Sequence, residues 1–161
     1  MILMEFISVC EPTLGEEELK NVIDAIKTGF ISGSGGKYIE EFETKFAKYL
    51  GVKHAITVRN GTAALHLALE VLKSLGSLKK GDEVITTDFT NVATVNAIVY
   101  AGLKPRFIDV EPRTYNIDVN KIEEKITDKT KAIMPVHIYG HPCQLDKITV
   151  SAKKYNLYII E

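Results

Sequence analysis

Cysteine is scarce in this 161-residue sequence, which contains only Cys10 and Cys143. Two cysteines so far apart do not form the framework of a disulfide-stapled domain, so we expect reduced, unreactive thiols and a cytoplasmic protein. Long apolar runs are also lacking, since none approaches the roughly 18 residues that a membrane span needs. The apolar start, residues 1–7, has no basic segment before it and no small-residue cleavage site, so it does not match a secretion signal.

An excess of one charge is lacking as well. Twenty basic and 21 acidic side chains leave a formal net charge of −1. Nucleic-acid-binding modules are usually basic overall, so we expect neither a nucleic-acid nor a membrane partner. Hydrophobic residues make up 45% and charged residues 25%, as in ordinary globular domains.

Residues 1–50 predict an N-terminal helical segment. Thr13 and Glu16 match a capping box, in which each side chain bonds the other residue's backbone N–H, and a helical apolar repeat follows. A second helix is predicted over 38–50, where aromatic side chains share one face. The glycine-rich stretch 32–36 between them predicts a loop.

Residues 51–161 predict an α/β segment in which strands and helices alternate. Such alternation is typical of βαβ units, so we expect a mostly parallel sheet flanked by helices on both faces. The expected strands cover residues 54–59, 83–87, 105–109, 132–137 and 157–161, and the expected helices 62–75, 91–101, 120–126 and 145–155. The last strand has no helix after it, and from this we expect the sequence to be part of a longer protein.

The most informative motif is the stretch 59–65, Arg-Asn-Gly-Thr-Ala-Ala-Leu, between an expected strand and an expected helix. A helix N-terminus favours phosphate because it presents unpaired N–H groups and a partial positive charge. Gly61 allows the backbone to approach a ligand closely, and Thr62 adds a hydroxyl donor. A phosphate site and a plain βα turn both fit this spacing, and a hairpin turn at Asn-Gly is a weaker third reading.

Other candidates have simpler explanations. The stretch 33–37, Gly-Ser-Gly-Gly-Lys, fails both the P-loop and the dinucleotide patterns, so we expect a loop between helices or a mobile loop over an active site. His137, His141 and Cys143 are zinc-ligand types, but no fourth ligand is evident and Gly140 breaks the helix that would align the histidines. We therefore expect no metal site.

Charged residues outside these motifs give no sign of catalysis. The acidic pairs are expected to mark strand ends, and three lysines are expected to be solvated, since nothing marks any of them as catalytic. These residues are Asp82 with Glu83, Asp109 with Glu111, and the lysines Lys37, Lys79 and Lys80.

Taken together and in order, the motifs resemble the N-terminal part of the DegT/StrS-type nucleotide-sugar aminotransferases, which are pyridoxal-phosphate (PLP) enzymes. The resemblance runs through nearly the whole chain. It rests on Glu11-Pro12, Gly29-Phe30-Ile31-Ser32-x-Ser34-Gly35, Glu41-Phe42-Glu43, the stretch 60–69, Gly81-Asp82-Glu83-Val84-Ile85, Val92-Ala93-Thr94-x-Asn96-Ala97, the stretch 130–140 and Ile160-Glu161.

The resemblance implies a PLP-transferase-like large domain, incomplete here and preceded by two helices. It also implies that Gly61 and Thr62 hold the cofactor phosphate. Asn91 stands where relatives carry an aromatic side chain that stacks on the cofactor ring, and an amide lacks that π-face. The lysine that binds the cofactor covalently, and the acid that pairs with its ring nitrogen, would follow Glu161, so no catalytic residue is assigned in this chain.

For the complete protein, the resemblance implies transfer of an amino group from an amino acid, glutamate by expectation, to a keto group on a nucleotide sugar. Homodimers that share their sites, and a role such as polysaccharide biosynthesis, are implied too. Two alternatives stay open from the sequence. One is a PLP-dependent sugar dehydratase of the same fold, and the other is a non-catalytic phosphate-binding α/β module.

Overall fold

The computed structural model describes residues 6–8, 10–29, 31–32 and 36–161, which divide into two compact units, residues 1–57 and 58–161. The predicted division at residue 50 into a helical and an α/β segment stays a prediction. Among the described residues, no helix is long and apolar enough to cross a membrane.

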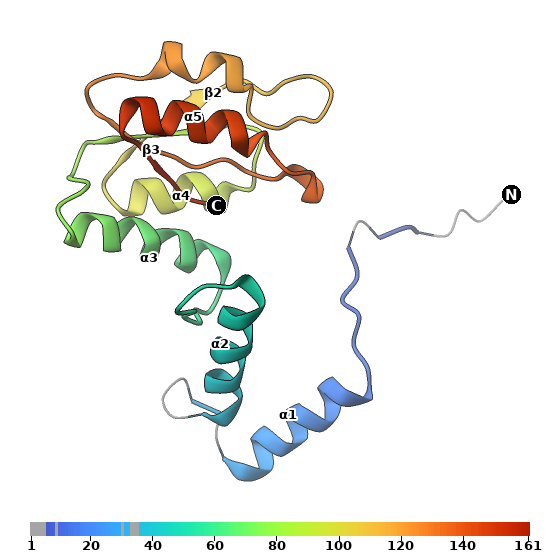
Figure 1. Ribbon diagram of the computed structural model, residues 1–161. Helices are drawn as coiled ribbons and strands as arrows, with labels where there is room; N and C mark the ends of the chain where they lie inside the picture. Colours follow the sequence, from blue (N-terminus) through green and yellow to red (C-terminus); the bar gives the residue numbers. More distant parts are fainter. Residues whose placement is uncertain (1–5, 9, 30, 33–35) are drawn as a thin grey trace, which may run out of the picture. The chain divides into compact units, whose positions relative to one another are not determined.

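The first unit contains helices α1, Glu16–Thr28, and α2, Lys37–Leu50 (Figure 1). The predicted capping box is wrong, because α1 begins after Gly15, whose backbone N–H donates to the Glu18 carboxylate at 2.7 Å. Both helices end at a glycine with positive φ, Gly29 at 75° and Gly51 at 68°, a conformation that glycine adopts without strain.

Residues 54–59 do not form the predicted strand, since no described residue pairs with them. The Glu43 carboxylate instead accepts hydrogen bonds from the Thr57 N–H and hydroxyl, both at 2.7 Å. These two bonds hold the pKa of Glu43 below its ordinary value.

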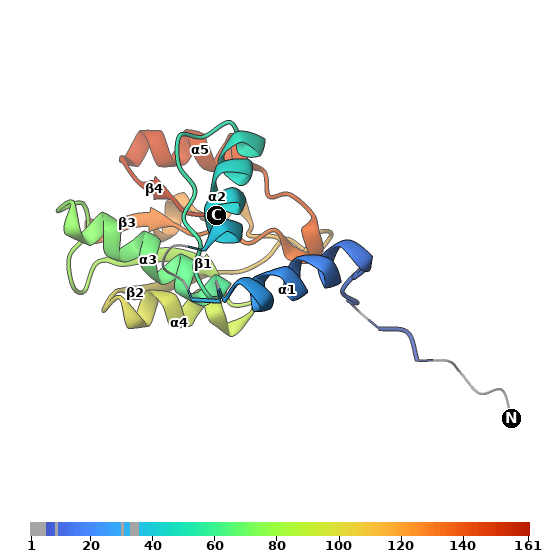
Figure 2. The ribbon, with the colours of Figure 1, turned by 90° about the horizontal axis from the view of Figure 1, so that it is seen from below.

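The second unit is a parallel four-stranded sheet with strand order β2-β1-β3-β4. Figure 2 shows β4 and β2 at its two edges. The strands are β1, Glu83–Thr87; β2, Lys104–Ile108; β3, Thr130–Ile133; and β4, Tyr158–Ile159. The helices are α3, Gly61–Ser74; α4, Val92–Tyr100; and α5, Leu145–Tyr155, with short 3₁₀ helices η1, Val119–Lys121; η2, Glu123–Lys125; and η3, Ile138–Gly140. The predicted helix over 120–126 is therefore wrong in type, because η1 and η2 cover most of it.

Helices cover both faces of the sheet, as the alternation of elements predicts. Successive side chains of a strand point to opposite faces, so Val84 packs with Leu69 of α3 and Ile98 of α4. Its neighbour Ile85 packs with Ile148 of α5 on the other face. Figure 1 shows the same layers, with α5 on one side of the sheet and α3 and α4 on the other.

Candidate functional site

The carboxyl ends of the parallel strands form one edge of the sheet, where α/β proteins place their ligands. Helix α3 runs antiparallel to the strands, because its C-terminal end leads to the start of β1. The Ser77 hydroxyl just beyond α3 lies 2.8 Å from that of Tyr158, at the start of β4, which supports this direction. The N-termini of α3 and α4 therefore both belong to the carboxyl edge.

The α3 N-terminus has the features that bind a phosphate group. Asn60 caps it, with its side-chain oxygen accepting from the Ala63 N–H at 2.9 Å, while the Asn60 carbonyl accepts from the Ala64 N–H at 3.1 Å. The amides of Gly61 and Thr62 come before these, where a helix provides no internal acceptor. The first turn contains no acidic residue, and a Cβ added at Gly61 would meet no heavy atom within 4 Å. A phosphate group fits this open end of the helix.

A cavity of about 510 Å³ lies at the same edge and contains Asn91, but its lining does not include Gly61 or Thr62. Two segments form it, one after β1 and one after β3. The lining residues are Asp88, Phe89, Thr90, Asn91, Val136, His137, Ile138 and Tyr139.

Asn91 is the N-cap of α4, and its side-chain oxygen accepts from the Ala93 N–H at 2.9 Å. The oxygen already has a partner, so the amide nitrogen is the group that Asn91 can offer a ligand. In the structure residues 88–90 form a bend, so Phe89 also lines the cavity, where its ring lies 5.4 Å from that of Tyr115.

His137 also lines the cavity, although its sequence position predicts the end of a strand and no role in a ligand site. The strand β3 ends earlier, at Ile133, and His137 lies in the segment that follows. Its Nδ1 accepts from the Cys143 N–H at 3.0 Å, which leaves the ring proton on Nε2. Nε2 lies 3.0 Å from the Glu161 carboxylate, to which it donates. Two contacts therefore fix the ring, and a position beyond a buried parallel strand is the signal that could have found it.

The other candidate residues have structural partners. The Cys143 thiol donates to the Val136 carbonyl at 3.1 Å, and burial raises its pKa. Among the described residues no three His, Cys, Asp or Glu side chains gather as metal ligands. Glu83 accepts from Thr127 at 2.7 Å and lies 3.5 Å from Arg106, at the opposite edge of the sheet. The glycine-rich stretch 33–37 lies largely outside the described residues.

A parallel sheet with an open helix N-terminus and a cavity at its carboxyl edge defines an α/β protein suited to a phosphorylated ligand. Residues 12–161 match the model of the DegT/DnrJ/EryC1/StrS aminotransferase family. The chain belongs to this family, which confirms the resemblance inferred from its motifs.

Named relatives and solved structures agree with this assignment. The chain is 48% identical to the GDP-perosamine synthase of Escherichia coli O157:H7 over 158 residues, which are 98% of this chain and 42% of that protein. An aminotransferase from Psychrobacter cryohalolentis superposes with a TM-score of 0.86 at 39% identity, over 93% of this chain and 37% of that one. The Escherichia coli GDP-4-keto-6-deoxy-D-mannose-3-dehydratase, solved with hydrated PLP, gives 0.85 at 30% identity, over 94% and 39%.

These neighbours confirm the predicted α/β fold of the PLP-transferase type. The chain spans about two fifths of the length of the curated relatives that it matches.

Proposed function

We propose that the protein containing this chain is a PLP-dependent aminotransferase that moves an amino group from an amino acid to a keto group on a nucleotide sugar. The observation that carries the proposal is the pair of amides at Gly61 and Thr62, which have no acceptor within the helix. The first turn of this helix also contains no acidic residue. In a member of this family, that end of α3 fits the phosphate of PLP.

Each nearby residue has a proposed part. The amides of Gly61 and Thr62 and the Thr62 hydroxyl hold the phosphate. Asn91 offers its amide nitrogen toward the ring, and His137, oriented by Cys143 and Glu161, presents a fixed imidazole to the same cavity. When bound, PLP supplies the electron-withdrawing ring on which amino-group transfer depends.

The substrates rest on the relatives. A protein named GDP-perosamine synthase is 48% identical to this chain, which supports an aminated sugar nucleotide as the product. Glutamate as the amino donor, a homodimer as the working form and the cytoplasm as the compartment are proposed with it.

A PLP-dependent sugar dehydratase is the second candidate. It is favoured by the TM-score of 0.85 to a GDP-4-keto-6-deoxy-D-mannose-3-dehydratase and by a polar Asn91 at the ring position. The identity to that dehydratase is 30%, against 48% to the synthase, so the aminotransferase is the better supported reading.

Mass spectrometry of the product separates the candidates. The complete polypeptide is incubated with PLP, [¹⁵N]glutamate and GDP-4-keto-6-deoxymannose. Transfer of ¹⁵N to the sugar supports the aminotransferase. Loss of a ring hydroxyl oxygen without nitrogen gain supports the dehydratase, and an unchanged sugar nucleotide contradicts both for this substrate.

Two matched variants test whether the reaction depends on Thr62. Thr62→Val removes the proposed phosphate donor at nearly constant shape, whereas Thr149→Val makes the same change on α5, on the other face of the sheet. We expect product formation to fall in the first variant and to persist in the second. Equal rates in the two variants would remove Thr62 from the proposal.

A further inference from the structure

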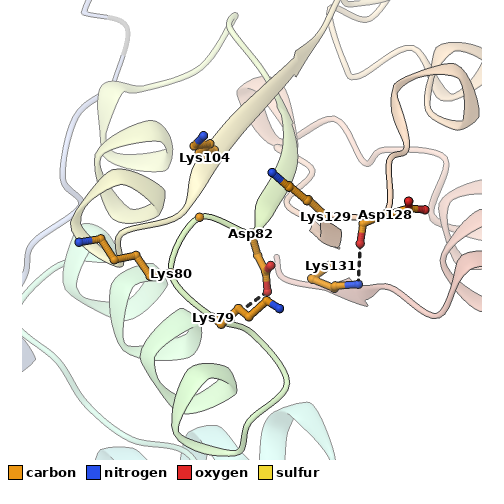
Figure 3. A pocket seen from close by; sticks show the side chains of 8 residues that line it. Lys79, Lys80, Asp82, Lys104, Asp128, Lys129 and Lys131 are labelled. Atoms are coloured by element: carbon orange, nitrogen blue, oxygen red, sulfur yellow. Dashed lines mark hydrogen bonds between the residues drawn. The ribbon is translucent and has the colours of Figure 1, made fainter.

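The edge of the sheet opposite the candidate cofactor site gathers five lysines. Parallel strands all start at one edge, so the loops that enter β1, β2 and β3 meet there. These loops surround a pocket of about 260 Å³, shown in Figure 3. Its lysines are Lys79, Lys80, Lys104, Lys129 and Lys131.

Backbone hydrogen bonds hold these loops in place. The Glu83 N–H donates to the Lys129 carbonyl at 2.8 Å, and the Lys104 N–H donates to the Asp82 carbonyl at 2.8 Å. Asp82 is only 3% exposed, and its carboxylate accepts from the Lys79 N–H at 2.8 Å. The lysines are therefore carried on a pre-formed frame, which lowers the entropic cost of gathering them around a ligand.

The charge of the pocket is not balanced within the α/β unit. Two acidic residues line it, Asp82 and Asp128, against five lysines. Among the described residues no ion pair involves any of the five lysines, and Lys131 donates to the Asp128 carbonyl rather than to a carboxylate. In contrast, Lys73 and Lys154 each lie 2.7 Å from a glutamate. The pocket thus concentrates positive potential that an anion would neutralise.

We propose that this pocket is a second binding site, specific for a diphosphate group. Lysines bind phosphate as compact point charges, and several around one cavity match an anion with more than one negative charge. The volume of 260 Å³ lies just below the roughly 300–1,000 Å³ of ordinary small-molecule pockets, which fits a small anion. No aromatic residue lines it, so it offers no stacking platform for a nucleobase.

Calorimetric titration of the complete polypeptide tests the proposal, with inorganic diphosphate, GDP and guanosine as separate ligands. The pocket variant Lys79→Gln with Lys129→Gln removes two charges from the site. The control variant Lys147→Gln with Lys153→Gln removes the same charge from exposed positions on α5.

We expect saturable diphosphate binding that is about tenfold weaker or more in the pocket variant and changes less than about twofold in the control. The variant Lys79→Arg with Lys129→Arg, which keeps both charges, should retain binding. Circular dichroism checks that each variant is folded.

GDP distinguishes the source of the diphosphate. Equal affinities of this site for inorganic diphosphate and GDP support the free anion, and tighter GDP binding supports a nucleotide. Equal weakening in the pocket and control variants would mean non-specific attraction to surface charge and would overturn the proposal, as would the absence of saturable binding to the wild type. The comparison of the pocket and control variants does not depend on the proposed transferase activity, because neither Lys79 nor Lys129 belongs to the carboxyl-edge site.

Discussion

Replacing Asn116 with alanine should destabilise the α/β unit. Asn116 is 4% exposed and links two loops through its side chain. Its oxygen accepts from the Ile138 N–H at 3.0 Å, and its nitrogen donates to the His141 carbonyl at 2.9 Å. The alanine variant leaves both of these backbone groups without a partner.

The two losses differ in size because the two groups differ in burial. Ile138 is 9% exposed, so its orphaned N–H should cost the full penalty of about 1–3 kcal/mol. His141 is exposed, and water can replace the lost donor there, which leaves the net value of one hydrogen bond, about 0.5–1.5 kcal/mol. We therefore expect Asn116→Ala to lower the free energy of unfolding by about 1.5–4.5 kcal/mol.

Urea unfolding and amide hydrogen exchange of the complete polypeptide measure this effect. The matched control is Asn120→Ala, since Asn120 is exposed and its backbone and side-chain nitrogens both donate to Asp118, two residues away. The control should change stability by less than about 0.5 kcal/mol. Exchange at the Ile138 amide should accelerate in Asn116→Ala alone. A loss below 1 kcal/mol, or one equal to that of the control, would refute the reasoning.

Three further predictions concern other parts of the chain. Asn60→Ala removes the acceptor of the Ala63 N–H, so it should cost about 1 kcal/mol in urea unfolding, and an unchanged midpoint would argue against the cap. Alkylation by iodoacetamide, followed by peptide mass spectrometry, should modify exposed Cys10 well before Cys143, whose pKa burial raises; similar rates would contradict this. Hydrogen bonds from Lys154 and Tyr155 lower the pKa of Glu123, so its contribution to stability is present above its ordinary pKa of 4.5 and is lost as the pH falls through the lower folded value. Glu123→Gln should therefore differ from the wild type in thermal unfolding at neutral pH and converge with it in acid, and a constant difference would exclude the linkage.

Elements with a strong internal pattern could be predicted from the sequence. The strand over 83–87 and the helix over 145–155 have the predicted bounds, because one is a β-branched run entered by a Gly-Asp turn and the other has a clear apolar face. Gly29 and Gly51, which follow the two N-terminal helices, are the residue type that commonly ends a helix, and both adopt positive φ in the structure.

Elements that depend on distant partners could not be predicted. Residues 54–59 have the β-branched composition of a strand, but a strand also needs a neighbour, and none pairs with them among the described residues. The helix predicted over 120–126 has a helical apolar spacing. In the structure the Asp118 side chain caps the first of two short turns, and the segment stays 3₁₀.

The candidate site also contains parts that are local in sequence, which could be predicted, and parts that are distant in sequence, which could not. Gly61 and Thr62 could be assigned because strand, turn and helix are local in sequence. The cavity could not, since it joins residues about 45 positions apart, such as Asn91 and His137. The lysine pocket was missed for the same reason, as Lys79 and Lys129 meet only when the parallel strands align their starting edges.

The central claim is that the α3 N-terminus holds the phosphate of PLP. Its most direct test is the dissociation constant of PLP for the complete polypeptide and for Gly61→Ala. The added Cβ meets nothing within the protein, and alanine suits a helix better than glycine, so the fold should be retained. We predict an affinity about tenfold lower or more, because the methyl group occupies space that the phosphate needs. An unchanged dissociation constant in a folded variant would contradict the claim.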